Sequence, residues 1–256
     1  MNTYIVGNWK MNFTVGESSI FLNKLLSGIP SHPGIKIIVA PSDIALQSLS
    51  LQTDRKNIRL AAQNIDYRDF GPITGETSVS QIRGLADYAL VGHPERRHVF
   101  HEHDKVIKAK VAACIRNKIT PILCVGETAH ERNTGETNEV LRDQLLGGLS
   151  DISIEDISKV IVAYHPAWIT SNTNFDHLAT PDQITDAIKT LRKTLRSNYS
   201  KEIEQNVPIL YGGNVNTSNA GTYIRIPGVN GLLVGGASLI ASQFIDIIEI
   251  VKKGQN

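Results

Sequence analysis

Three side chains suited to acid–base chemistry each follow a short apolar run of the sequence. They are Lys10, His93 and His165, in the segments Gly-Asn-Trp-Lys, Gly-His-Pro-Glu and Tyr-His-Pro-Ala. An imidazole with a pKa near 6.5 exchanges protons around neutrality, and in its neutral form it can polarise a carbonyl group. A lysine ammonium neutralises a phosphate or a developing enediolate oxygen. These residue types indicate an acid–base site.

Two glycine pairs, Gly212-Gly213 and Gly235-Gly236, also follow or border apolar runs. Glycine lets backbone N–H groups approach a phosphate closely, and the second pair is predicted to open a helix whose N-terminus favours an anion. Each feature alone has an ordinary explanation, as a solvated lysine, a loop histidine or a turn. Their convergence on one face would instead indicate a phosphate site beside the acid–base site.

The elements that must position these residues are short runs of apolar and β-branched residues, typical of strands buried on both faces of a parallel sheet. Eight such runs occur, at Tyr4–Val6, Ile35–Ala40, Ile58–Ala62, Tyr88–Val91, Ile119–Val125, Val160–Tyr164, Val207–Leu210 and Gly231–Val234.

Amphipathic stretches with helical spacing lie between the predicted strands, at 105–117, 138–149 and 182–199. Thr180-Pro181 is a typical helix start, and Gly147-Gly148 a typical helix stop. Eight strands alternating with helices predict an α/β fold, a TIM barrel of the (β/α)8 type, as one domain over residues 1–256. A doubly wound sheet is the alternative, but the first strand lacks the Gly-x-Gly-x-x-Gly turn.

The composition limits the classes of molecule that the protein is expected to bind. The 256 residues are 41% hydrophobic and 20% charged, with a net charge of +1, which provides no overall field for nucleic acid or a membrane surface. No apolar run approaches the length of a bilayer span, and the first residues lack the features of a signal peptide. The two cysteines, Cys114 and Cys124, indicate a reducing compartment, so we expect a cytoplasmic protein with neither metal nor cofactor.

Longer motifs give the chain a resemblance to triosephosphate isomerases over essentially its whole length. The motifs are Gly7-Asn8-Trp9-Lys10-Met11-Asn12, Thr74-Gly75-Glu76, Gly92-His93-Pro94-Glu95-Arg96-Arg97, Cys124-Val125-Gly126-Glu127-Thr128, Tyr211-Gly212-Gly213-Asn214-Val215 and Leu233-Val234-Gly235-Gly236-Ala237-Ser238-Leu239. The resemblance implies interconversion of dihydroxyacetone phosphate and glyceraldehyde 3-phosphate through an enediolate.

It also implies roles for individual residues. Lys10 and His93 would be electrophilic, with Asn8 alongside and Glu95 as a supporting carboxylate. The phosphate of a small sugar phosphate would be bound by Asn8, Lys10, Gly213, Asn214, Gly235 and Gly236. Thr74 would lie at the tip of a loop that enters the partner subunit of a homodimer.

The chain departs from the family around this same site. His165 stands where the family has its catalytic glutamate, and the lid after it, residues 169–179, lacks the usual Gly-Thr-Gly. Pro94 and Asn214 each replace a serine. Asp176, in the altered lid, is a further candidate for the catalytic base and would supply a carboxylate.

Three interpretations remain open. The chain is an isomerase that is slow or has a shifted substrate, with His165 as the base. Alternatively it is a catalytically inactive paralogue that binds a phosphorylated small molecule, or it carries out a different reaction on such a molecule in the same barrel.

Overall fold

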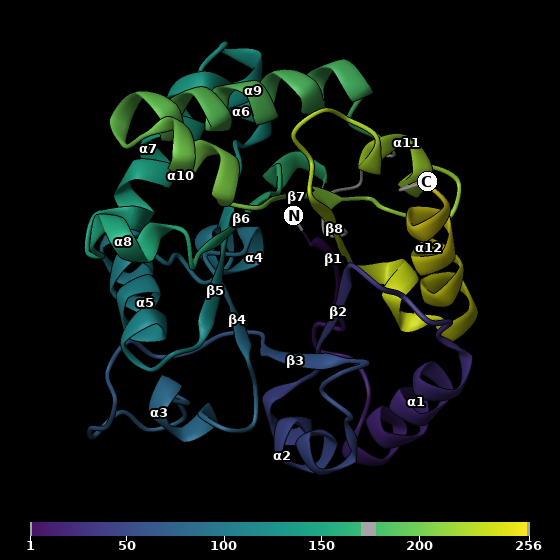
Figure 1. The fold of residues 1–256 in the computed structure, drawn as a ribbon. Coiled ribbons are helices and arrows are strands. Elements are labelled where there is room, and N and C mark those ends of the chain that lie inside the picture. Colours follow the sequence, from purple (N-terminus) through teal and green to yellow (C-terminus); the bar gives the residue numbers. More distant parts are fainter. Residues whose placement is uncertain (1, 170–177, 255–256) are drawn as a thin grey trace.

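The strands form a closed, all-parallel barrel in which each strand pairs with its neighbour in sequence and β8 pairs with β1 (Figure 1). The computed structural model describes residues 2–169 and 178–254. Within these residues the strands are β1 (Thr3–Asn8), β2 (Ile35–Ala40), β3 (Arg59–Ala62), β4 (Tyr88–Val91), β5 (Thr120–Val125), β6 (Ile161–Tyr164), β7 (Ile209–Gly213) and β8 (Gly231–Val234). The predicted barrel is therefore confirmed.

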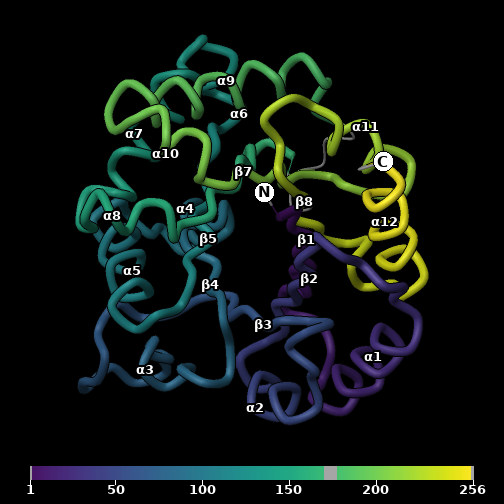
Figure 2. The backbone as a smooth tube through the Cα atoms, viewed as in Figure 1, coloured from purple at the N-terminus to yellow at the C-terminus, as the bar shows by residue number. Residues whose placement is uncertain are grey.

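Helices surround the strands, and the first and last strands lie side by side where the barrel closes (Figure 2). The described α-helices are α1 (Val15–Gly28), α2 (Asp43–Gln52), α3 (Val79–Ile82), α4 (Pro94–His98), α5 (Asp104–Arg116), α6 (Ala129–Asn133), α7 (Thr137–Leu149), α8 (Ile154–Ile157), α9 (Pro181–Asn198), α10 (Lys201–Asn206), α11 (Ala220–Ile224) and α12 (Ala241–Lys253). Two 3₁₀ helices, η1 (Ala167–Ile169) and η2 (Gly236–Leu239), follow β6 and β8. No helix among the described residues is long and apolar enough to cross a membrane.

Local sequence accounts for the start of α9. The Thr180 side chain accepts a hydrogen bond from the Gln183 N–H, the Gln183 side chain accepts one from the Thr180 N–H, and Pro181 occupies the first turn. This capping box satisfies two backbone donors that the helix itself leaves unpaired.

Two glycine pairs, predicted to form a helix end and a turn, lie inside a helix and a strand. Gly147 and Gly148 lie inside the last turn of α7 and do not end it. A Cβ on Gly148 would lie 2.6 Å from Cδ2 of Leu123, so this glycine lets α7 pack closely on β5. Gly212 and Gly213 are the last residues of β7 and not a turn after it.

Successive side chains of each strand point to opposite faces of the sheet, so the hydrophobic core has two layers. On β1, Val6 points into the barrel with Ile38, Leu90 and Leu233, while Ile5 belongs to the larger layer between strands and helices. A barrel filled by side chains is a rigid frame, so the carboxyl ends of its strands hold their relative positions.

Candidate functional site

The three residues selected from the sequence meet at the carboxyl end of the barrel, although they come from three different strands. Nζ of Lys10, after β1, lies 2.6 Å from Oε1 of Glu95, which follows β4. The rings of His93, after β4, and His165, after β6, have centroids 4.7 Å apart with an angle of 61° between their planes. The predicted convergence of Lys10, His93, His165 and Glu95 is therefore seen in the structure.

Hydrogen bonds to its N–H and carbonyl groups hold the backbone of Lys10 in place. Its φ of +51° lies in the left-handed region, its N–H donates to Oδ1 of Asn8 at 3.1 Å, and its carbonyl accepts from Nε2 of Gln63 at 2.8 Å. Gln63 Nε2 also donates to the carbonyl of Ala40, 2.9 Å away. A residue in this conformation persists only where its surroundings hold it, so the backbone of Lys10 is fixed before any ligand arrives. No pattern around Gln63 predicts this role.

His93 is locked in one tautomer by the helix that it caps. It is the N-cap of α4, and its Nδ1 accepts a hydrogen bond from the backbone N–H of Glu95 at 3.4 Å. Because a backbone N–H can only donate, this hydrogen bond favours the tautomer with the ring proton on Nε2, although Oε2 of Glu95 also lies 3.5 Å from Nδ1. Burial, with a smaller contribution from the charge of Lys10, lowers the pKa of His93 to about 3. His93 is therefore a neutral donor, as an electrophilic residue requires.

Pro94, one of the departures from the family pattern, occupies the first position of α4. At that position an N–H would have no partner within the helix, and the fixed φ of proline favours the helical turn. Pro94 therefore removes no hydrogen bond from the helix.

His165 is almost completely enclosed, with 6% of its surface exposed. Its backbone N–H donates to the Val125 carbonyl at 2.7 Å, which ties the end of β6 to β5. Burial lowers the pKa of the ring well below its usual value, and the neighbouring His93 and Lys10 lower it further. Nδ1 is buried and has no hydrogen-bond partner among the described residues.

The imidazole of His165 fits only because residue 212 is a glycine. A Cβ on Gly212 would lie 3.0 Å from Cγ and 3.3 Å from Nε2 of the ring, and closer still to Cδ2. The Cδ2–Nε2 edge of the ring therefore faces β7, and Gly212 leaves the space that the ring fills.

The two glycine pairs lie side by side, as a phosphate cradle requires. Gly213 pairs in register with Val234, the residue before Gly235. A Cβ on Gly235 or Gly236 would meet nothing within 4 Å, so open space lies in front of both. The predicted helix after this pair is the four-residue 3₁₀ helix η2, whose Ser238 Oγ lies 3.5 Å from the Asn8 carbonyl. Asn214 is exposed beside this space.

Glu127 was missed as a supporting residue. Its carboxylate is fully buried, and its Oε1 accepts hydrogen bonds from the side chains of Tyr164 at 3.1 Å, Trp168 at 2.9 Å and Arg132 at 2.9 Å. Two of these donors flank His165 in sequence. The available signal was the motif containing Glu127, but Tyr164 and Trp168 lie 37 and 41 residues further along the chain.

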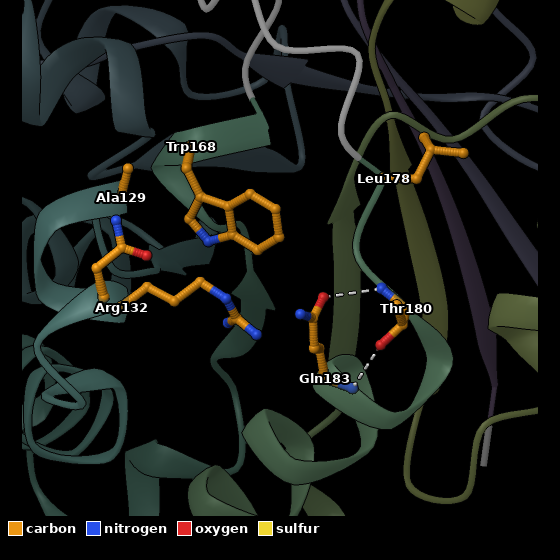
Figure 3. Close-up of a pocket in the computed structure, with 7 residues that line it drawn as sticks. Ala129, Arg132, Trp168, Leu178, Thr180 and Gln183 are labelled. Atoms are coloured by element: carbon orange, nitrogen blue, oxygen red, sulfur yellow. Dashed lines mark hydrogen bonds between the residues drawn. The ribbon is translucent and has the colours of Figure 1, made fainter.

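A hollow of about 470 Å³ lies next to this cluster (Figure 3). Trp168 and Arg132 line one side, and the Arg132 guanidinium lies 4.7 Å from the centre of the Trp168 ring. Leu178 and the capping box of Thr180 and Gln183 line the other side. The lid residues 170–177, including the candidate carboxylate Asp176, lie outside the described residues.

A closed parallel barrel with a lysine, a neutral histidine and two glycine pairs at the carboxyl ends of its strands defines the class as a (β/α)8-barrel protein with a cluster of acid–base side chains. The model of the triosephosphate isomerase family matches residues 3–251, and the chain belongs to that family.

Named relatives agree with this assignment. A triosephosphate isomerase of Chlamydia trachomatis serovar L2 is 40% identical over 248 residues, which cover 96% of this chain and 89% of that protein. The enzyme of the same name from Clostridium acetobutylicum is 38% identical over 245 residues, covering 95% and 97% of the two chains. That of Streptococcus mutans serotype c is 36% identical over 249 residues, covering 97% and 98%.

Proposed function

We propose that this protein interconverts dihydroxyacetone phosphate and glyceraldehyde 3-phosphate, with His165 as the base. The observation that carries the proposal is the neutral His93, fixed as an Nε2–H donor by the N–H of Glu95 and accompanied by Lys10 and His165. This arrangement supplies two donors for a carbonyl oxygen and one ring that can accept a proton.

The reaction is a proton transfer between adjacent carbons. His165 accepts a proton from the carbon next to the carbonyl, and the electron pair of that C–H bond forms the double bond of an enediolate. The negative charge moves to the former carbonyl oxygen, where Lys10 and the Nε2–H of His93 stabilise it. A proton then passes from the hydroxyl group on the deprotonated carbon to the former carbonyl oxygen. His165 returns its proton to the former carbonyl carbon, the electron pair of the carbon–carbon double bond forms that new C–H bond, and the isomeric sugar phosphate results.

His165 makes this a slow isomerase. A carboxylate presents two oxygens to two neighbouring carbons, whereas a neutral imidazole presents one basic nitrogen. Burial and the charge of Lys10 also lower the pKa of His165, which weakens the ring as a base. We therefore expect turnover below that of a variant with glutamate at this position.

Phosphate binding is assigned to Asn8, Lys10, Gly213, Asn214, Gly235 and Gly236. Open space in front of Gly235 and Gly236 and the charge of Lys10 support this role. The substrate class is accordingly a small phosphorylated sugar.

The working form is a homodimer. Thr74 lies exposed in a turn of the loop after β3, where it can enter a partner subunit. Large exposed apolar side chains follow the neighbouring strands β1 to β4, at Met11, Ile44, Phe70 and Phe100. Exposed apolar side chains in the segments after these strands support a protein interface on this side of the barrel.

The location is the cytoplasm, as a reducing compartment suits the two cysteines. Cys114 and Cys124 are free and buried, and burial raises the pKa of both thiols to about 12. Thiols in this state are inert structural groups.

A coupled assay with glyceraldehyde 3-phosphate tests the proposal. The protein should show turnover, and His93→Gln should reduce kcat by about 10²–10⁴-fold, the usual contribution of a positioned acid–base group. His165→Gln removes a weaker base and should reduce kcat by at least about tenfold. A His165→Gln variant as active as the parent would exclude His165 as the base. Absence of turnover in the parent would favour the inactive, ligand-binding alternative.

A further inference from the structure

A second hollow lies at the other end of the barrel from the acid–base cluster. Its volume is about 340 Å³, and its lining comes from α9, α10 and Pro227. Arg192, one of the lining residues, donates to the carbonyls of Val207 and Gly228, which precede β7 and β8. The acid–base side chains follow their strands, so the two sites are separated by the length of the barrel.

The lining of this hollow is strongly cationic. Four cations lie on one face of α9 at the spacing i, i+3, i+4 and i+7, and they are Lys189, Arg192, Lys193 and Arg196. Among the described residues that line the hollow, Glu204 is the one carboxylate. Four cations and one anion give the hollow a formal charge of +3, whereas the whole chain has +1. The positive charge of the chain is therefore concentrated here.

Arg192 supplies a charge that is fixed in position. Its guanidinium donates to four uncharged oxygens, namely the carbonyls of Glu204, Val207 (2.7 Å) and Gly228 (2.8 Å) and Oδ1 of Asn230 (2.5 Å). The described residues place no carboxylate in an ion pair with it, because the Glu204 carboxylate lies beside Arg196 instead, 3.6 Å from Nη1. Partial burial lowers the pKa of Arg192, and an anion bound nearby would offset the cost of burying this charge.

The other three cations are exposed and can turn toward a ligand. Nζ of Lys189 lies 3.5 Å from Oδ1 of Asp186, and Arg196 has only the long contact with Glu204. Lys193 forms no ion pair within the described part of the chain. Exposed ion pairs contribute little to stability, so these side chains can be redirected to an anionic ligand at small cost.

The size and the apolar part of the lining indicate an organic ligand. Ile188 and Pro227 supply apolar surface beside the cations. The volume falls in the range of small-molecule sites, about 300–1,000 Å³, and is roughly ten times the ~30 Å³ that one water molecule occupies in the liquid. Inorganic phosphate alone would leave most of this space and the apolar surface unused. The small net charge of the chain provides no wider field for a nucleic acid or a membrane.

We propose that this hollow is a ligand site for a nucleoside polyphosphate. The phosphate groups bind Lys193 and Arg196 in the field of Arg192, and the base packs against Ile188 and Pro227. Charge-assisted contacts to phosphate are the stronger kind of hydrogen bond, and the apolar contact distinguishes a nucleotide from a simple anion. The site is independent of the proposed isomerisation.

Isothermal titration of the full-length protein with ATP, in buffer without magnesium, tests the proposal. The buffer contains saturating glycerol 3-phosphate, so that the proposed phosphate site at the carboxyl end is occupied. ATP should bind with a Kd below about 1 mM. Adenosine lacks the charges and tripolyphosphate lacks the base, so each should bind at least about tenfold more weakly.

Two matched variants locate the binding. Lys193 on α9 and Lys24 on α1 are both exposed helical lysines, and replacing either with glutamate changes the net charge equally. Lys193→Glu should weaken ATP binding at least about tenfold, whereas Lys24→Glu should change it by less than about twofold because distant exposed charges are screened. The melting temperature of each variant first shows that it is folded.

The proposal is overturned by any of three results. These are no binding of ATP at millimolar concentration, binding of adenosine or tripolyphosphate as tight as that of ATP, and equal ATP affinities in Lys193→Glu and Lys24→Glu. Isomerase activity does not enter the test, so its outcome and that of the proposed function are separate.

Discussion

Replacing Gly212 with alanine directly perturbs the packing around the His165 ring. The added Cβ would lie 3.0 Å from Cγ of the ring and closer to Cδ2. The ring must retreat by roughly 1 Å to restore ordinary van der Waals contact. Overpacking of a buried site of this kind costs about 1–3 kcal/mol of unfolding free energy. A reacting group displaced by about 1 Å can lose up to 10²-fold in rate.

Chemical denaturation and the coupled isomerase assay measure the two effects on one preparation. Gly212→Ala should lose stability in that range and lose kcat more than it raises KM. Gly16→Ala is the matched control, because a Cβ there meets nothing within 4 Å and the residue is helical. That control should be neutral or slightly stabilising.

A double-mutant cycle shows whether the cost arises at His165. In a His165→Ala background the clash is absent, so Gly212→Ala should cost little there, and the two substitutions should couple strongly. Equal costs in the two backgrounds would refute the contact between Gly212 and the ring as the cause.

Three further predictions concern pH, phosphate and assembly. Burial lowers the pKa of His93 and of His165 in the folded protein, so the unfolded chain takes up these protons at a higher pH than the folded protein does. Below pH 6.5 the free energy of unfolding should therefore fall by about 1.4 kcal/mol per pH unit for each histidine. Denaturation at pH 7.0 and 5.5 should show a smaller loss in His93→Gln than in the parent, and equal losses would contradict the burial of a neutral ring. Gly235→Asp should abolish the rise in melting temperature caused by glycerol 3-phosphate, since it places a carboxylate in the cradle. Light scattering should give a dimer for the parent at micromolar concentration and a smaller species for Thr74→Arg, whereas a monomeric parent would refute the assembly.

The strands were predictable because a barrel strand buried on both faces leaves a clear signal. Ile35–Ala40, Tyr88–Val91 and Gly231–Val234 were predicted with the bounds that the structure shows. The start of α9 was equally clear, because the capping residue and the proline act locally.

What the sequence pattern misassigned depends on contacts between distant segments. Gly148 was predicted to end a helix, because glycine is common at that position. It lies inside α7 instead, where its small size lets the helix pack closely on Leu123. Glu127 lies in a recognisable motif, but its supporting role arises from two donors at and just after the end of β6, Tyr164 and Trp168. The tautomer of His93 follows from its place at the start of α4, which no residue pattern states by itself.

The central proposal is that the electrophilic half of an isomerase site is intact while its base is weak. The most direct test is kcat/KM for the isomerisation of glyceraldehyde 3-phosphate by the parent and by His165→Glu. Restoring a carboxylate at this position should raise kcat/KM by about 10–10³-fold, less than the full contribution of a positioned base because the altered lid remains. A fall in kcat/KM on this substitution would show that His165 is a working base in a retuned site, and would contradict the proposal of a weak base.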